Sequence, residues 1–74
     1  MNERDYFERL IGKFLKIVVP INGYDYRYNG KLIQVMDDQI MLEDVKTGPV
    51  LIRMKSVTVL SIEDYNDKNG WVVV

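Results

Sequence analysis

The segment Gly30–Ile62, GKLIQVMDDQIMLEDVKTGPVLIRMKSVTVLSI, carries the clearest periodic pattern in this sequence. Within it, apolar residues recur at every second position, which is the period of a β-strand and differs from that of a helix. The alternating residues form three groups: Ile40 and Leu42, then Val50, Ile52 and Met54, then Val57 and Val59. The pattern predicts short strands joined by tight turns, with one hydrophobic face that curls on itself or finds a partner.

Composition narrows the possible classes of protein. The chain has 74 residues, ten basic and eleven acidic side chains and a formal net charge of −1, so it offers no overall field for nucleic acid or acidic lipid. At this length we expect one domain that buries only about 60% of the surface its unfolded chain exposes. Without Cys or His, disulfides and the usual zinc or transition-metal ligand sets are excluded, and oligomerisation is the remaining common source of stability. We expect a cytoplasmic protein with no cofactor and no membrane partner, since no signal-peptide or membrane-length apolar run occurs.

A short helix is predicted over residues 3–11. Its apolar residues, at spacings of three and four, are Tyr6, Phe7, Leu10 and Ile11. Asn2 is a suitable N-cap, and Gly12 can end the helix in the left-handed conformation. A helix of this length is not stable alone, so it should lie on the sheet, with Leu10 and Ile11 buried.

Five strands are predicted, over about residues 13–21, 24–36, 40–47, 50–55 and 57–62. Asn22-Gly23 is a strong hairpin signal between the first two, and Gly30 indicates a sharp bend inside the second. Tyr24, Tyr26 and Tyr28 share one face; they could stack on bases, but tyrosines are also good strand formers. Residues 63–74 are interpreted as a polar tail, whose apolar end should pack on a neighbouring subunit or be disordered.

The turn Asp37-Asp38-Gln39 is the first candidate for chemistry. Paired acids can bind a metal or act as a general acid and base. Here, adjacent turn residues point apart and Asp is a common turn former, so a structural turn is the favoured interpretation. Ser56 and Ser61 have no evident base, and without His or Cys we expect no enzymatic activity.

The order of a short helix and five strands, with three short motifs, resembles the Sm and Sm-like superfamily that includes bacterial Hfq. The motifs are Gly30-x-Leu32, Leu42-Glu43-Asp44-Val45 and Ile52-Arg53, and the resemblance covers about residues 4–62. It implies a mainly β fold: a small, strongly bent five-stranded barrel of the SH3 type with an N-terminal helix, formed by residues 1–62. It also implies a homo-oligomeric ring of five to seven subunits.

The resemblance further implies single-stranded RNA as a partner and indicates which residues would contact it. Gln39 stands where the family has an asparagine, and Asp37 or Asp38 stands where it has an aspartate that orients the pocket. Arg53 would be a second base contact, and Lys55 a phosphate contact. The sequence departs from the family at two points: this turn has no aromatic residue, which would remove about 1 to 3 kcal/mol of stacking per base, and Met54 replaces a glycine.

The sequence leaves two alternatives to RNA binding open. An Sm-like ring could act as a protein-interaction or scaffold module without significant RNA binding, which the acidic turn and the net charge favour. A monomeric barrel of the Src-homology type could instead serve as an accessory module. A binding assay with oligo-U or oligo-A at several salt concentrations distinguishes the scaffold ring from an RNA-binding ring. A native mass equal to that of one chain identifies the monomeric module.

Overall fold

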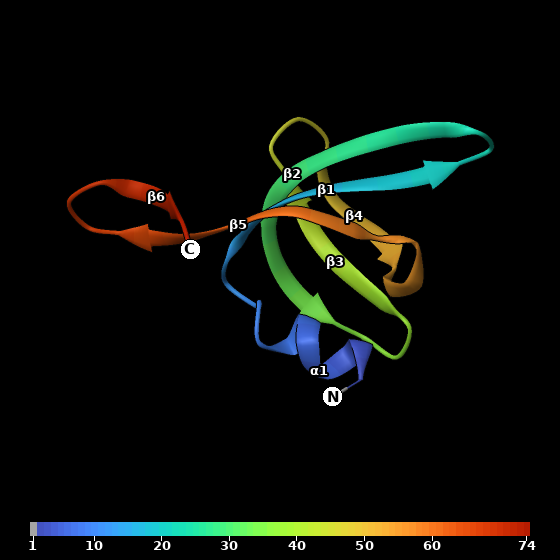
Figure 1. Ribbon diagram of the computed structural model, residues 1–74, viewed down its shortest axis with the longest axis horizontal. Helices are drawn as coiled ribbons and strands as arrows, with labels where there is room; N and C mark the ends of the chain where they lie inside the picture. Colours follow the sequence, from blue (N-terminus) through green and yellow to red (C-terminus); the bar gives the residue numbers. More distant parts are fainter. Residues whose placement is uncertain (1) are drawn as a thin grey trace.

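The computed structural model describes residues 2–74, which form one antiparallel sheet with a short helix at the N-terminal end (Figure 1). The elements in chain order are α1 Glu3–Glu8, β1 Phe14–Ile21, β2 Tyr24–Val35, β3 Gln39–Asp44, β4 Gly48–Arg53, the 3₁₀ helix η1 Met54–Ser56, β5 Thr58–Asn66 and β6 Gly70–Val73. The strands lie in the order β4-β3-β2-β1-β5-β6. The prediction of a mainly β chain with an N-terminal helix is therefore confirmed.

The predicted number of strands is wrong, because the described residues form six strands and not five. The residues expected to be a polar tail extend β5 as far as Asn66 and then form β6, which projects with β5 as a hairpin (Figure 1). The Asn66 side chain accepts hydrogen bonds from the Lys68 and Asn69 amides, and this local turn reverses the chain. Gly70 completes the reversal with a φ of 73°.

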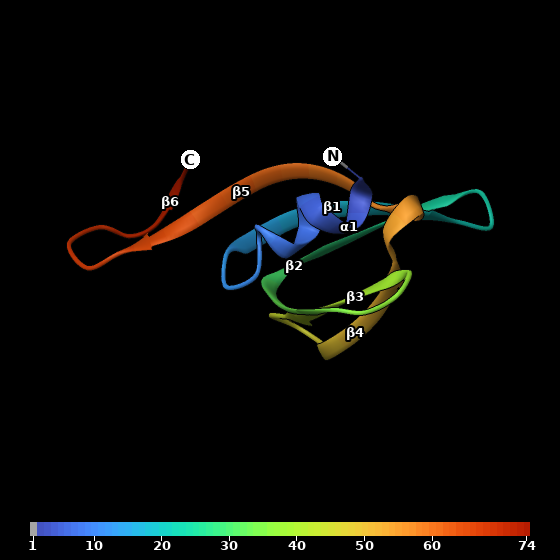
Figure 2. The same ribbon diagram turned by 90° about the horizontal axis from the view of Figure 1, so that it is seen from below.

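The sheet is bent without closing into a barrel over residues 2–74, since β4 and β6 remain its two edge strands. Figure 2 shows β3 and β4 in a layer separate from β5, with the long strand β2 passing between the layers. A bulge interrupts the β2–β3 register between Leu32 and Gln34. Gly30 lies in β2 between Leu15 of β1 and Asp44 of β3. The prediction of a bent sheet is thus confirmed, whereas the prediction that the sheet closes into a barrel is wrong for residues 2–74.

The core lies inside the bend and beneath the helix. Its buried apolar residues are Phe7, Leu10, Leu15, Ile17, Val19, Leu32, Ile40, Leu42, Ile52 and Met54. Leu10 is 7% exposed, as predicted, but Ile11 is 47% exposed. The helix ends at Glu8, so both residues lie in the following turn and do not share the helical face that the sequence predicted. Asn2 caps α1 by accepting a hydrogen bond from the Asp5 amide at 2.8 Å.

The hairpin between β1 and β2 turns at Asn22 and Gly23, which both have positive φ values of 51° and 84°. This is the backbone that an Asn-Gly turn favours. The hairpin extends beyond the core, so Tyr24 and Tyr26 are exposed while Tyr28 packs against buried residues. Neither helix within residues 2–74 has the length and apolar character needed to cross a membrane.

Candidate functional site

The turn between β2 and β3 and the junction between β4 and η1 meet at one end of the sheet. The Met54 amide donates a hydrogen bond to the Asp38 carbonyl oxygen at 2.8 Å, and Gln39 is paired with Arg53 across β3 and β4. The Met36 amide donates to the Gln39 carbonyl oxygen, which closes the turn. Backbone hydrogen bonds therefore hold two segments, about fifteen residues apart in sequence, in fixed positions.

This arrangement brings together most of the residues that the sequence singled out. Asp38, Gln39 and Arg53 are neighbours, and Lys55 follows in η1. Since Ile40 and Ile52 are buried and strand side chains alternate, Gln39 and Arg53 share the face turned away from the core. An amide and a guanidinium thus lie next to each other on the outer face of the sheet.

Asp37 contacts a residue of the N-terminal helix, which the sequence did not indicate. Its fully exposed carboxylate lies 3.5 Å from the Arg4 guanidinium, whose Nε also donates a 3.0 Å hydrogen bond to Glu8. Arg4 therefore links α1 to the β2–β3 turn. The sequence analysis did not predict this contact, because an interaction between residues more than thirty positions apart leaves no local pattern.

Some of the cationic side chains at this end of the sheet have carboxylate partners and others have none. Arg4 has two carboxylate partners. Over residues 2–74, by contrast, no carboxylate lies within 4.0 Å of the charged atoms of Arg53 or Lys55. These two cations are separated by a single residue and are both exposed. They can attract an anionic group, while Asp37 and Asp38 supply opposing charge on the neighbouring turn.

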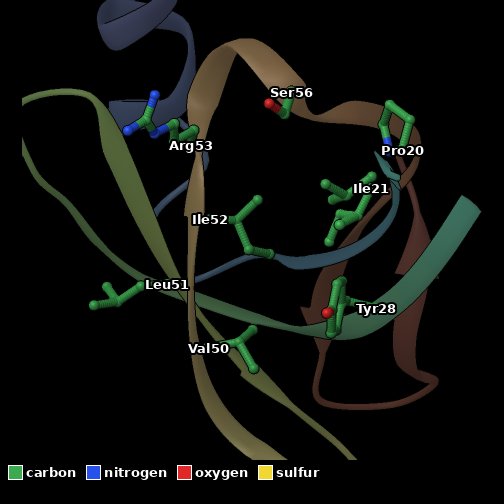
Figure 3. Close-up of a pocket in the computed structure, with 9 residues that line it drawn as sticks. Pro20, Ile21, Tyr28, Val50, Leu51, Ile52, Arg53 and Ser56 are labelled. Atoms are coloured by element: carbon green, nitrogen blue, oxygen red, sulfur yellow. The ribbon is translucent and has the colours of Figure 1, made fainter. Parts of the chain in front are cut away.

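An apolar cleft of about 390 Å³ opens beside the free edge of β4 (Figure 3). Val50 and Ile52 point into it from β4, toward Tyr28 and Ile21 of the β1–β2 hairpin, whereas Leu51 points to the other side (Figure 3). The cleft is bounded on one side by unpaired strand backbone, since β4 is an edge strand. It can accept side chains of a strand added to β4.

A second cleft, of about 270 Å³, runs along β5. Its lining residues are Tyr6, Val59, Leu60, Ser61, Ile62, Val73 and Val74. This cleft lies beside the part of β5 that β6 leaves unpaired. The two strands β4 and β5 therefore each have an unpaired edge with an apolar cleft next to it.

Among residues 2–74, Asp44 is the buried acidic residue, and its role is to hold the β3–β4 turn. Burial by itself raises the pKa of Asp44, but its oxygens accept hydrogen bonds from the amides of Asn29, Lys46 and Thr47 and from the Thr47 hydroxyl. These bonds favour the charged form and outweigh burial, so the pKa lies below its ordinary value. A carboxylate kept ionised by four donors is suited to structure rather than to proton transfer.

The described residues contain no group of three or more acidic side chains placed to hold a metal ion. No protein-family model, curated protein or solved structure matches the chain.

Proposed function

We propose that this chain is an Sm-like protein that forms a closed homo-oligomeric ring in the cytoplasm and binds single-stranded RNA at the β2–β3 turn and the β4–η1 junction. The observation that carries the proposal is the pairing of Gln39 with Arg53 on the outer face of the sheet. An amide both donates and accepts hydrogen bonds, and a guanidinium offers a charged fork. Together they suit a base edge and its phosphate.

The remaining residues of the site have separate roles in this proposal. Lys55 contributes an exposed positive charge for a phosphate. Asp38 orients the turn through its carbonyl oxygen, which accepts the Met54 amide. Asp37 is drawn toward Arg4, so its contribution is to position the turn relative to the helix. The absence of an aromatic side chain in the turn makes us expect weaker binding than a stacked base would give.

Ring formation is supported by the two strands that have unpaired edges. β4 is free along its outer edge, and β5 is free where β6 does not pair with it. Pairing β4 of one subunit with β5 of the next would bury both apolar clefts and satisfy the open backbone groups. Such a contact joins two different surfaces, so it either closes into a ring or propagates as a filament. The resemblance to Sm-like proteins suggests closure with five to seven subunits.

The test is fluorescence anisotropy of labelled oligo-U and oligo-A at several salt concentrations, with native mass measured in parallel. Arg53→Ala should weaken binding and reduce the salt dependence without changing the assembled mass, because it removes one exposed cation. Lys68→Ala is the matched control, since it removes one positive charge from the β5–β6 turn, far from the site in Figure 1. Equal losses in the two variants would mean that binding depends on charge alone.

A scaffold ring without RNA affinity is the second candidate function. The exposed Asp37 and Asp38 favour it, because negative charge on the turn that meets the β4–η1 junction weakens the attraction of Arg53 for phosphate. A wild-type ring that causes no anisotropy change at low salt would establish this alternative. A wild-type protein that stays monomeric at micromolar concentration would contradict both ring proposals and favour an isolated barrel-like module.

A further inference from the structure

Strand β6 lies outside the hydrophobic core. Among residues 2–74, the buried apolar side chains all lie between Phe7 and Met54. In β6, Trp71 is 39% exposed and Val73 is 71% exposed. Trp71 makes surface contacts with Tyr65, its cross-strand partner, and with Phe14, at ring-centroid distances of 5.5 and 5.7 Å. The strand therefore contributes no side chain to the buried core.

What β6 does cover is the outer edge of β5. One edge of β5 pairs with β1, from Thr58 to Glu63. On the other edge, β6 pairs with residues 63–66, and the Val74 amide extends the contact by donating to the Ile62 carbonyl oxygen at 3.0 Å. The outer edge is thus covered from Ile62 to Asn66 and open from Thr58 to Ser61.

Pairing with β6 shortens the part of the β5 edge to which another strand can bind. Without β6, the outer edge of β5 would be open along all nine residues of the strand. With β6, that edge is replaced by the open segment Thr58–Ser61 and by β6 itself, which has four residues. Very short edge strands and covered edges are two of the means by which soluble proteins limit strand addition.

The open segment has no charge or proline to oppose pairing, as its residues are Thr58, Val59, Leu60 and Ser61. The cleft beside it ends at Val73 and Val74, so the end of β6 forms one wall of the place where another strand would lie. β4, the opposite edge of the sheet, contains Pro49, which has no amide proton to donate. The part of β4 after Pro49, Val50–Arg53, matches the open segment in length.

We propose that β6 is an intramolecular edge cover, which restricts strand addition by a second copy of this chain to Thr58–Ser61 of β5. The identity of the added strand, β4 of the second copy, rests on the ring assembly proposed above. The cover itself does not, because its effect on self-association is measurable whether the wild-type protein is a ring or a monomer.

The test uses full-length variants at Val72, which is paired with Asp64. Val72→Pro removes an amide donor and should release β6, whereas Val72→Thr keeps a β-branched residue that pairs normally. Hydrogen exchange at the Ile62, Asp64 and Asn66 amides, which alternate toward β6, reports whether β6 has been released. Sedimentation velocity and native mass spectrometry over a range of concentrations report assembly, and circular dichroism reports whether the core still unfolds cooperatively.

We expect Val72→Pro to lose amide protection at Ile62, Asp64 and Asn66, to keep a cooperative core and to form species larger than the wild type, whose size increases with concentration. Val72→Thr should behave as the wild type. If the single proline leaves the amides protected, Val72→Pro/Val74→Pro, which also removes the donor to Ile62, is measured in the same way.

Two results would overturn the proposal. One is a released β6 with the wild-type mass at every concentration, since the uncovered edge would then attract nothing. The other is loss of the folded core in Val72→Pro, which would make β6 part of the folding unit and not a cover. A monomeric wild type whose Val72→Pro variant self-associates would reject the ring and retain the edge cover.

Discussion

The backbone at Gly30 lies so close to the carbonyl oxygen of Glu43 that a Cβ atom added at residue 30 would come within 1.9 Å of it. The crowding group is backbone, and it belongs to a strand that is itself paired on both sides. It therefore cannot move aside as the end of a flexible side chain would. The close approach of β2 and β3 at the bend requires a residue without a side chain.

The first prediction concerns this contact. Gly30→Ala should lower the free energy of unfolding by about 1 to 3 kcal/mol or more, which is the usual cost of overpacking a well-packed site. Chemical denaturation measures the effect. Arg27→Ala, at an exposed position of the same strand, should change stability little. A Gly30→Ala variant as stable as the wild type would show that the two strands can separate at the bend.

The second prediction concerns the pH dependence of stability. The folded pKa of Asp44 lies below its ordinary value of 3.8, so its contribution is fully present above that value and is lost as the pH falls through the folded pKa. Asp44→Asn replaces one accepting oxygen by a donor and should cost about 1 to 3 kcal/mol at neutral pH. Urea unfolding should show the gap between wild type and variant narrowing in acid.

The control for Asp44 is Asp67→Asn, at an exposed position of the β5–β6 turn, which should leave the acid dependence unchanged. A gap between wild type and Asp44→Asn that stays constant from neutral to strongly acidic pH would contradict the assignment. The loss would then come from altered packing of the turn and not from the carboxylate charge.

The third prediction compares two neighbouring residues in the turn that follows the helix. Leu10→Ala should lower the free energy of unfolding by about 2 to 5 kcal/mol, as for other buried leucines, because Leu10 is buried in the core. Ile11→Ala should have a much smaller effect, because Ile11 is about half exposed. Thermal or urea unfolding distinguishes them. Similar losses for the two variants would place Ile11 in a contact that the structure does not have.

The fourth prediction concerns the link between α1 and the β2–β3 turn. Arg4→Ala should change stability by less than about 1 kcal/mol, because Arg4 and Glu8 are both about half exposed and water screens their attraction. The change should shrink further at high salt. Thermal melts at two ionic strengths give both values. A larger, salt-independent loss would mean that Arg4 stabilises the turn by packing and not by charge.

Several features follow from short segments of sequence because their causes are local. Alternating apolar residues select the strand conformation and place Ile40, Leu42 and Ile52 on the buried face. Asn22-Gly23 adopts a turn that few other dipeptides allow. The capping of α1 by Asn2 depends on residues three positions apart. In each case, the interaction that determines the structure lies within a few residues.

The site was only partly accessible to such arguments. Gln39, Asp38 and Arg53 were singled out through a family resemblance, and the register between β3 and β4 places them side by side. The contact of Arg4 with Asp37 joins segments whose separation depends on where the helix lies on the sheet. The low pKa of Asp44 likewise depends in part on the Asn29 amide, which belongs to another strand.

The extension of β5 and the sixth strand show which features depend on contacts between distant segments. Glu63 and Asp64 make residues 63–66 look like a solvated tail, but Lys16 lies 3.5 Å from Glu63 and Lys13 pairs with Asp64. These lysines come from the other end of the chain, just before and within β1, so the charges that balance Glu63 and Asp64 cannot be seen in the local sequence. Strand periodicity was readable from the sequence because it is a property of consecutive residues. The number of strands and the edges left open depend on which distant segments supply hydrogen bonds and opposite charge, and those partners exist only in the folded chain.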